Sequence, residues 1–476
     1  LIGEEVLGPA FLPVFMRELD IESEKSAWSF ANTVLTLQAI LLVAVACVLC
    51  LAPSLAVNLL THWGPDAAPE KYALATQSVR TLGPAVIGLS LGSTTYVLLN
   101  GYKRFFLAAF GDAVWKFAVV FFLITGAVLA HDNAQMLMWG LVAGSLCKVG
   151  THLFGLRDKL RQFRPEFAFS HPAFKRFCWL ALPLLAGILM AKVRDEVNNV
   201  YLLSALDQSG LMQANSMGRK LQSTLLFLIP YTLSIAAFPF FCELVDKNDH
   251  QKLGELVTRF GRMLLSVFAP FSLFVAVAAV PFTSLIFKGG HFDAVAVQRT
   301  AVSLACYTFV LPAAAIEALV MQAFFANRRM LAVTLIGILF SSLSILISWV
   351  GLQVSGGREL LLLAFIAGGF TLSRAFKCVT LVEMLKKNAP VFPFGQTAAF
   401  MFRVGLAAGL ASGASWLLLE RVSMIADLHG RMGDLIKLAV AGAAFGLVYL
   451  SAAYALRIGE VRELFALAWA KVRKQA

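Results

Sequence analysis

Long apolar runs separated by short polar stretches dominate the sequence. A bilayer core requires about 20 consecutive apolar residues per helix, and residues 1–15 are apolar but too short to cross it. Twelve other runs are long enough: 28–60, 76–101, 105–130, 135–156, 177–205, 211–242, 260–287, 297–325, 330–353, 360–385, 397–419 and 434–456. The pattern predicts an all-α polytopic membrane protein, in which residues 1–15 are the second half of a helix.

Basic residues concentrate in alternate loops between these runs. Of the lysines and arginines in the loops and at the ends of the predicted helices, 23 lie on one side and 6 on the other. Cytoplasmic loops carry the excess of positive charge. We therefore expect an inner-membrane protein with a cytoplasmic C-terminus, and residues 458–476 predict an amphipathic tail on that side. The formal charge of +12 then faces anionic lipid rather than nucleic acid.

The order of helices recurs along the chain. From Trp28 a long apolar helix ends in the proline-containing LCLAPSLAVNLL, and the next helix ends at Lys103–Arg104. From Phe260 the same order recurs and ends at Arg328–Arg329, 225 residues later. Each run of the second copy comes six runs after its counterpart in the first copy, an even number, so both copies have one orientation. This arrangement predicts two parallel lobes related by an axis along the membrane normal.

Enzyme and cofactor signatures are missing from the sequence. The chain is 59% hydrophobic and 14% charged, against roughly 25% charged residues in soluble domains. Its seven cysteines lie in apolar runs, where cysteine behaves as a small hydrophobe, and its seven histidines are scattered. We expect no metal site, no cofactor, no ATP-binding loop and no catalysed reaction.

Ionisable residues inside the apolar runs are the candidates for function, because burying them in a membrane is costly. The densest group is Lys192, Arg194, Asp195 and Glu196. Lys192 and Glu196 are four residues apart and can pair on one helix face. A structural network and a role in a polar cavity both remain open for this group.

Arg219 and Lys220 add positive charge to the run 211–242, where the sequence offers no nearby acid. An arginine can bind a phosphate group through two parallel hydrogen bonds. We favour a substrate role for Arg219 over the alternative of an arginine at the outer interface.

Other charged residues lie in or near the runs. Asp112 and Lys116 are four residues apart and predict a neutralised pair within one helix. Glu317 predicts either a salt bridge or a group that couples transport to a proton or cation. Arg80 and Arg374 either line the cavity or extend to the membrane surface.

Four stretches resemble the MurJ/MviN family of lipid II flippases, within the multidrug/oligosaccharidyl-lipid/polysaccharide exporter superfamily. They are Glu4 with PAFLPVF at 9–15, residues 72–105, 209–262 and 281–329. The resemblance implies fourteen helices, of which this sequence holds twelve and half of another, so we expect the natural N-terminus to precede Leu1. It also implies a cationic cavity between two six-helix lobes, and a groove for the lipid tail formed by the last two helices.

Particular residues follow or depart from the family pattern. Arg219 falls where the family has a cavity arginine in its eighth helix. Gly218 and Gln222 replace acidic residues, Glu317 replaces a basic one, and the motif after the first glutamate reads EEVLG. These departures bear on the substrate and its coupling rather than on the fold.

The predicted organisation combines the repeat with the resemblance. It divides the chain into an N-terminal lobe lacking its first one and a half helices (1–157), a cytoplasmic linker (158–173), a C-terminal lobe (174–390), two additional transmembrane helices (391–457) and a cytoplasmic amphipathic tail (458–476).

The leading hypothesis is a flippase that carries an undecaprenyl-diphosphate-linked saccharide, above all lipid II, across the inner membrane by alternating access. Membrane potential or a monovalent cation is expected to drive it, with cell-wall synthesis enzymes as partners. The alternatives are an exporter of another lipid-linked polysaccharide unit or a drug, and a non-transporting scaffold for envelope assembly. The predicted substrate-binding residues are Arg219, Lys220, Arg80, Arg194 and Glu4; the predicted coupling or cavity network is Lys192, Asp195, Glu196, Asp112, Lys116, Glu317 and Arg374.

Overall fold

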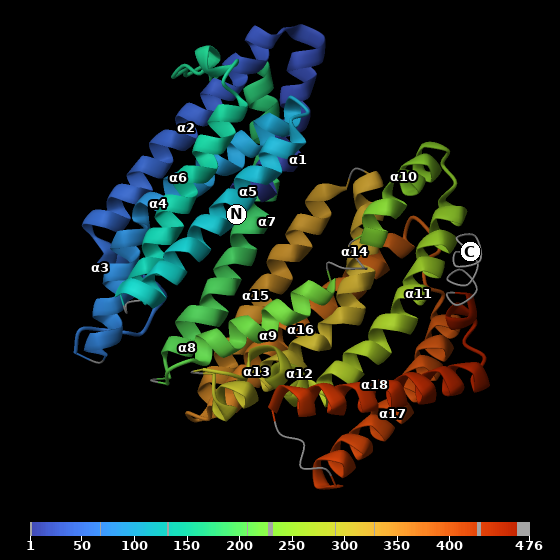
Figure 1. The fold of residues 1–476 in the computed structure, drawn as a ribbon. Helices are drawn as coiled ribbons and strands as arrows, with labels where there is room; N and C mark the ends of the chain where they lie inside the picture. Colours follow the sequence, from blue (N-terminus) through green and yellow to red (C-terminus); the bar gives the residue numbers. More distant parts are fainter. Residues whose placement is uncertain are drawn as a thin grey trace, which may run out of the picture. The chain divides into compact units, whose positions relative to one another are not determined.

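The computed structural model is built from helices (Figure 1). It describes residues 2–66, 68–130, 133–206, 208–226, 232–290, 292–327, 329–425 and 430–463. Within these ranges there is no β-strand, and the all-α prediction is confirmed. The chain forms two compact units, Leu1–Val193 and Arg194–Ala476.

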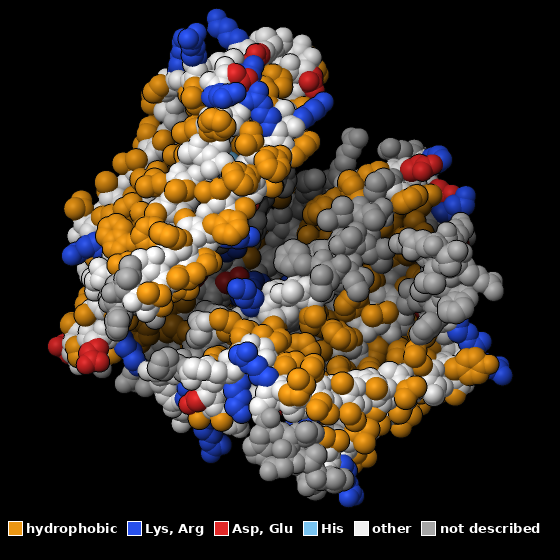
Figure 2. Space-filling view, viewed as in Figure 1, with side chains coloured by type: hydrophobic (Ala, Val, Ile, Leu, Met, Phe, Trp, Pro, Cys, Tyr) orange, Lys and Arg blue, Asp and Glu red, His pale blue; other side chains and the backbone are white. Residues whose placement is uncertain are grey.

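The first unit contains seven longer helices. They are α1 (Ile2–Arg17), α2 (Glu24–Leu51), α3 (Pro53–Leu60), α4 (Pro69–Gly101), α5 (Phe105–Thr125), α6 (Asn133–Gly155) and most of α7 (Pro172–Glu196). Large apolar side chains point outward from these helices, as Figure 2 shows for one face; Phe106, Phe117 and Leu182 are each 70–76% exposed. Such a surface is stable against lipid tails rather than water.

The second unit begins within α7. Its helices are α8 (Leu202–Ser204), α9 (Leu211–Leu226), α10 (Thr232–Asp246), α11 (His250–Val277), α12 (Ala279–Phe287), α13 (Ala294–Thr308), α14 (Val310–Ala326), α15 (Met330–Ser355), α16 (Glu359–Lys386), α17 (Phe394–Ile425) and α18 (Gly430–Ala455). The contacts divide the chain inside α7, whereas the sequence placed a linker at 158–173. The lobe boundaries stay a prediction.

Ten helices of the described residues are long and apolar enough to cross a membrane, or eleven if α13 and α14 form one span with a 42° bend. Each of the twelve predicted runs falls on helices. The run 211–242 falls on α9 and α10, which flank residues 227–231, outside the described part. The predicted tail likewise lies beyond the description after residue 463.

The two copies of the predicted repeat share one backbone hydrogen bond. The second basic residue after α4 and the second basic residue after α14 make the same bond. The amide of Arg104 donates to the carbonyl of Leu99 at 2.8 Å, and the amide of Arg329 donates to that of Phe324 at 3.0 Å. Both donors and both acceptors are 225 residues apart, as in the sequence pattern.

One long helix in each copy is broken at a single residue. Ala52 separates α2 from α3, and Ala278 separates α11 from α12. Pro53 follows the first break directly, and Pro281 lies in the first turn of α12 after the second. A proline lacks the amide needed to continue a helix, which explains why each span ends in a short separate helix.

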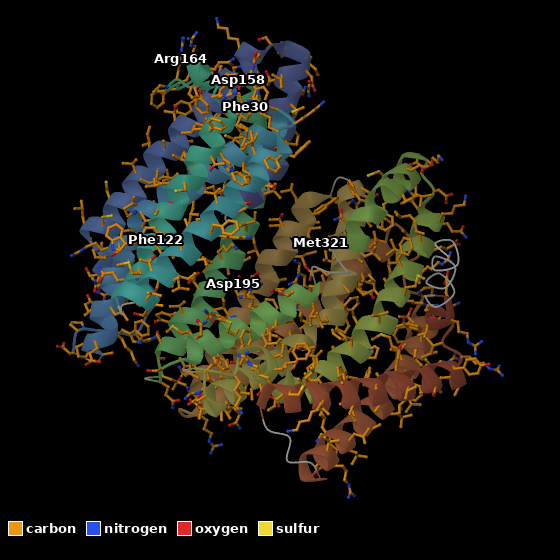
Figure 3. All side chains as sticks on the ribbon, in the orientation of Figure 1. Phe30, Phe122, Asp158, Arg164, Asp195 and Met321 are labelled. Carbon is orange, nitrogen blue, oxygen red and sulfur yellow. The ribbon has the colours of Figure 1, made fainter. Side chains whose placement is uncertain are left out.

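An aromatic core holds one end of the first unit together. Phe11, Phe15 and Phe30 are fully buried, and Trp28 is 2% exposed. The indole of Trp28 donates to the hydroxyl of Tyr102 at 2.7 Å. Figure 3 shows Phe30 toward the same end of this unit as Asp158 and Arg164, which belong to a basic-rich loop. The core therefore fixes the end that the charge pattern assigns to the cytoplasm.

Candidate functional site

Three arginines of the second unit surround one aromatic ring. The guanidinium carbons of Arg194, Arg219 and Arg374 lie 4.8, 5.0 and 5.8 Å from the centre of the Phe370 ring. The face of an aromatic ring attracts cations. Phe370 and Arg374 are four residues apart on one face of α16, whereas the other two arginines come from α7 and α9. Three helices therefore bring their positive charge to one place.

Asp195, whose position Figure 3 labels, joins two of these arginines. Its Oδ1 accepts hydrogen bonds from Arg194 Nε at 2.9 Å and Nη2 at 2.6 Å. Its Oδ2 accepts one from Arg219 Nη2 at 2.8 Å. The expectation that Arg219 has no acidic partner is wrong, because α7 and α9 bring together residues that are 24 positions apart.

A second carboxylate, Glu317, lies beside the third arginine. Its side chain is 2% exposed and contacts Arg374 Nε at 2.6 Å and Lys377 Nζ at 2.8 Å. Of the two roles predicted for Glu317, the salt bridge is confirmed. Lys377 was not among the predicted site residues, although its position seven residues after Phe370 places it on the same face of α16.

Positive charge exceeds negative charge in this cluster. Three arginines and Lys377 face the carboxylates Asp195 and Glu317, which gives these six groups a formal charge of +2. The arginine and lysine side chains are 15–27% exposed, so water screens them only partly. The arrangement suits an anion that carries two negative charges.

A polar cavity of about 290 Å³ opens on one side of the cluster. Its lining residues are Asp195, Glu196, Asn199, Ser216, Arg219, Lys220 and Ser223. Asn199 Oδ1 accepts hydrogen bonds from Asn215 at 3.0 Å and from Ser216 at 3.1 Å. These bonds tie α9 to the π-helical turn Val197–Tyr201 that follows α7, and so position Arg219 beside the cavity.

Gly218 allows α9 to pack closely against α13. A Cβ atom at this position would lie 2.8 Å from both the amide nitrogen of Leu304 and the Cβ of Ser303. An acidic side chain, expected here from the family pattern, has no space. Asp195 supplies the carboxylate beside Arg219 from a different helix.

Asp112 forms its ion pair between helices rather than within one. Its Oδ1 lies 2.6 Å from the Nζ of Lys148 on α6. Lys148 is 4% exposed, and its methylenes pack against Gly92 of α4. The predicted pair with Lys116 is therefore wrong. The ammonium group of Lys148 is buried and would be costly without a carboxylate partner, whereas Lys116 is exposed.

The predicted site residues fall into two groups. Arg194, Asp195, Glu196, Arg219, Lys220, Glu317 and Arg374 belong to the second unit, and Glu4, Arg80, Asp112, Lys116 and Lys192 to the first. Arg80 is exposed on α4, and the side chain of Glu4 is outside the described part. No three His, Cys, Asp or Glu side chains among the described residues are placed to hold a metal ion.

Comparisons with known proteins identify the same family as the sequence resemblance. The family model described as "Lipid II flippase MurJ" matches residues 1–428. A probable lipid II flippase MurJ of Borreliella burgdorferi is 22% identical over 76% of this chain and 70% of its own length. The lipid II flippase MurJ of Burkholderia cenocepacia is 23% identical over 69% of the chain, which spans 64% of that relative.

A longer alignment and a solved structure extend the match. A probable lipid II flippase MurJ of Bdellovibrio bacteriovorus is 21% identical over 98% of this chain and 87% of its own length. The solved structure titled "Lipid II flippase MurJ, inward closed conformation" has a TM-score of 0.72 and 16% identity, and covers 96% of this chain and 89% of its own. At this identity the structure shows that the fold is shared.

Proposed function

Because the chain belongs to the lipid II flippase MurJ family, we propose that it moves lipid II from the inner to the outer leaflet of the bacterial inner membrane by alternating access. The family, together with ten or eleven sufficiently long apolar helices among the described residues, makes it a multi-pass membrane protein. We place its C-terminus in the cytoplasm on the excess of 23 basic residues over 6. The substrate crosses chemically unchanged, so the activity is transport without catalysis.

The observation that carries this proposal is the bridging geometry of Asp195. One carboxylate oxygen accepts hydrogen bonds from Arg194 and the other accepts one from Arg219, at 2.6–2.9 Å. A phosphate group presents several oxygens to guanidinium groups in the same way. In the proposed cycle, the diphosphate of lipid II takes the place of Asp195 between the two arginines. Asp195 holds the arginines in position when no substrate is present.

Glu317 has a different role in this proposal. It is 2% exposed, whereas Asp195 is 25% exposed and lines the cavity. Removing one partner of a buried ion pair leaves an uncompensated charge, which costs about 3–5 kcal/mol. Glu317 therefore stays paired with Arg374 and Lys377 through the cycle. Asp195 is the carboxylate that the substrate phosphate replaces beside the arginines.

The charge of the cluster favours membrane potential as the driving force. The six groups carry +2 when empty and are neutralised by a diphosphate of charge −2. A potential that is negative inside draws the empty cationic site inward and does not oppose outward movement of the neutral loaded site. Each elementary charge moved is worth about 2.3 kcal/mol per 100 mV. Cell-wall enzymes that make and consume lipid II are the proposed partners.

Depletion of the full-length protein in its host, with an assay of lipid II exposed in the outer leaflet, tests the proposal. Wild type and Arg421→Ala, an exposed arginine at the end of α17, should restore outer-leaflet lipid II. Arg219→Ala should not, and Arg219→Lys should restore it only in part, since lysine cannot bind phosphate through two parallel hydrogen bonds.

Two results of this experiment would contradict the proposal at different points. Unchanged outer-leaflet lipid II after depletion would remove lipid II as the substrate. Full restoration by Arg219→Ala would leave the transport assignment in place and exclude the phosphate role of this arginine.

A further inference from the structure

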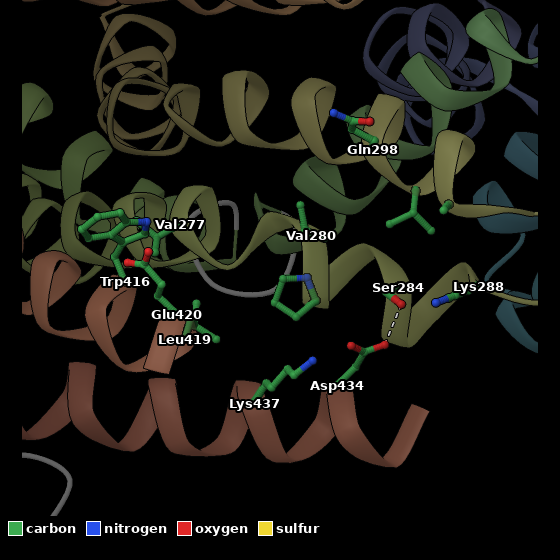
Figure 4. A pocket seen from close by; sticks show the side chains of 13 residues that line it. Val277, Val280, Ser284, Lys288, Gln298, Trp416, Leu419, Glu420, Asp434 and Lys437 are labelled. Atoms are coloured by element: carbon green, nitrogen blue, oxygen red, sulfur yellow. Dashed lines mark hydrogen bonds between the residues drawn. The ribbon is translucent and has the colours of Figure 1, made fainter. Parts of the chain in front are cut away.

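A second and larger cavity lies between α12, α13 and the last two helices (Figure 4). Its volume is about 620 Å³. Val277, Val280, Leu419 and Trp416 form its apolar wall. Val280 is 54% exposed and Trp416 is 55% exposed, so the cavity opens to the outside of the helices. In a membrane protein this side faces lipid.

Four charged side chains also line the cavity. Lys288 follows α12, Glu420 belongs to α17, and Asp434 and Lys437 belong to α18. Ser284 Oγ donates to Asp434 Oδ2 at 2.6 Å and holds this carboxylate at the cavity wall (Figure 4). Two positive and two negative groups therefore line one cavity and sum to zero charge.

The position of the cavity along the helices is that of a head-group region. Lys288 and Glu420 lie where apolar helices end, and Asp434 lies in the first turns of α18. The loops at this end belong to the side with few basic residues, which we assign to the outer leaflet. Tryptophan is enriched at the boundary between lipid tails and head groups, and Trp416 lies beside Glu420 in the lining of the cavity (Figure 4).

We propose that this cavity binds a phospholipid with a primary amine in its head group, an ethanolamine phospholipid of the outer leaflet. The lysines receive the phosphate, and Asp434 and Glu420 accept hydrogen bonds from the ammonium group. The acyl chains lie along Val280 and Trp416. The neutral charge of the wall disfavours a diphosphate, because its two negative charges would meet both carboxylates. This site is separate from the arginine cluster and independent of the transport proposal.

Native mass spectrometry of the purified full-length chain in detergent tests the site. The probes are dioleoyl phosphatidylethanolamine, phosphatidylcholine and phosphatidylglycerol in equal amounts. The choline group has no N–H to donate, so phosphatidylethanolamine should be retained over phosphatidylcholine by roughly tenfold, the factor for one charge-assisted hydrogen bond.

Matched variants locate the binding. Asp434→Asn still accepts the hydrogen bond of Ser284 and should fold, but it should abolish the preference for ethanolamine over choline. Lys437→Gln should lower retention of both lipids. Arg421→Gln removes a charge at the same end of α17 outside the cavity and should change nothing.

Three outcomes would overturn the proposal. Equal retention of the ethanolamine and choline lipids by wild type would exclude recognition of the amine. An unchanged preference in Asp434→Asn would place the lipid elsewhere. Displacement of phosphatidylethanolamine by inorganic pyrophosphate or by equal phosphatidylglycerol would identify an anion site instead.

Discussion

Replacing Asp195 with asparagine tests whether this carboxylate occupies the place of a substrate phosphate. The variant keeps the size of the side chain and removes its negative charge. Asp195 accepts three hydrogen bonds from two guanidinium groups, and each such bond to a charged group contributes about 1.5–3 kcal/mol. A phosphate must break these bonds before it can form its own.

The expected magnitude follows from this competition. Asparagine still accepts a hydrogen bond but lacks the charge. We therefore expect the free energy of phosphate binding to become more favourable by about 1.5–3 kcal/mol, a factor of roughly 10 to 100 in affinity. The empty variant leaves Arg194 and Arg219 facing each other without a carboxylate, and its melting temperature should fall.

Calorimetric titration of the purified chain with inorganic pyrophosphate measures the affinity, and thermal melts with and without pyrophosphate measure the stability. Asp195→Asn should bind pyrophosphate more tightly than wild type and regain more stability from it. Glu243→Gln, which removes an exposed carboxylate of α10 outside this cavity, is the control and should bind pyrophosphate as wild type does. Equal or weaker binding by Asp195→Asn would refute the exchange of carboxylate for phosphate.

Three further predictions concern stability and packing. Glu317→Gln should lower the free energy of unfolding by about 3–5 kcal/mol, because it leaves two cations beside a buried neutral side chain. A free energy of unfolding equal to that of wild type in denaturant titrations would exclude a structural role. Gly218→Asp should disrupt the packing of α9 and abolish transport, whereas Gly218→Ala should retain part of it; an active aspartate variant would contradict the close approach to α13. The Arg104 guanidinium lowers the pKa of Asp158 from 3.8 to about 2. Its contribution to stability should be complete above pH 4 and disappear as the pH falls toward 2; a wild-type melting temperature that falls no more steeply than that of Asp158→Asn over this range would contradict it.

The helices of this protein are predictable from the sequence because bilayer thickness sets their length. Each of the twelve apolar runs falls on helices, and the repeat at a spacing of 225 residues appears again in the hydrogen bonds after α4 and α14. Both properties depend on local composition. Division of the chain into lobes is a matter of tertiary contact, and the contacts divide it within α7 rather than in a polar loop.

The partners of the charged residues were less predictable. Spacing along one helix suggested Asp112 with Lys116, but the observed partner is Lys148 on the neighbouring helix. The sequence pattern did not predict a role for Phe370 in the site, because a phenylalanine in an apolar run is expected to pack in the core or to face lipid. Its role beside three arginines depends on three helices meeting, which no local pattern records.

Gly218 shows how a departure from the expected family pattern can be understood. In the sequence it is the loss of an acid beside Arg219. In the structure it is the residue that lets α9 approach α13, while Asp195 supplies the negative charge from α7. An acid beside the arginine is therefore present in this chain, and it comes from α7.

Reconstitution of the full-length protein in proteoliposomes tests the central claim most directly. Lipid II carrying a fluorescent group on its peptide would be placed on one side, and its appearance on the other would be followed with an impermeant quencher. A potassium diffusion potential, negative on the side of the substrate, should accelerate translocation by wild type, and Arg219→Ala should show none. Translocation by wild type that ignores the potential, or translocation by Arg219→Ala at the wild-type rate, would contradict a cationic site that carries the diphosphate across the membrane.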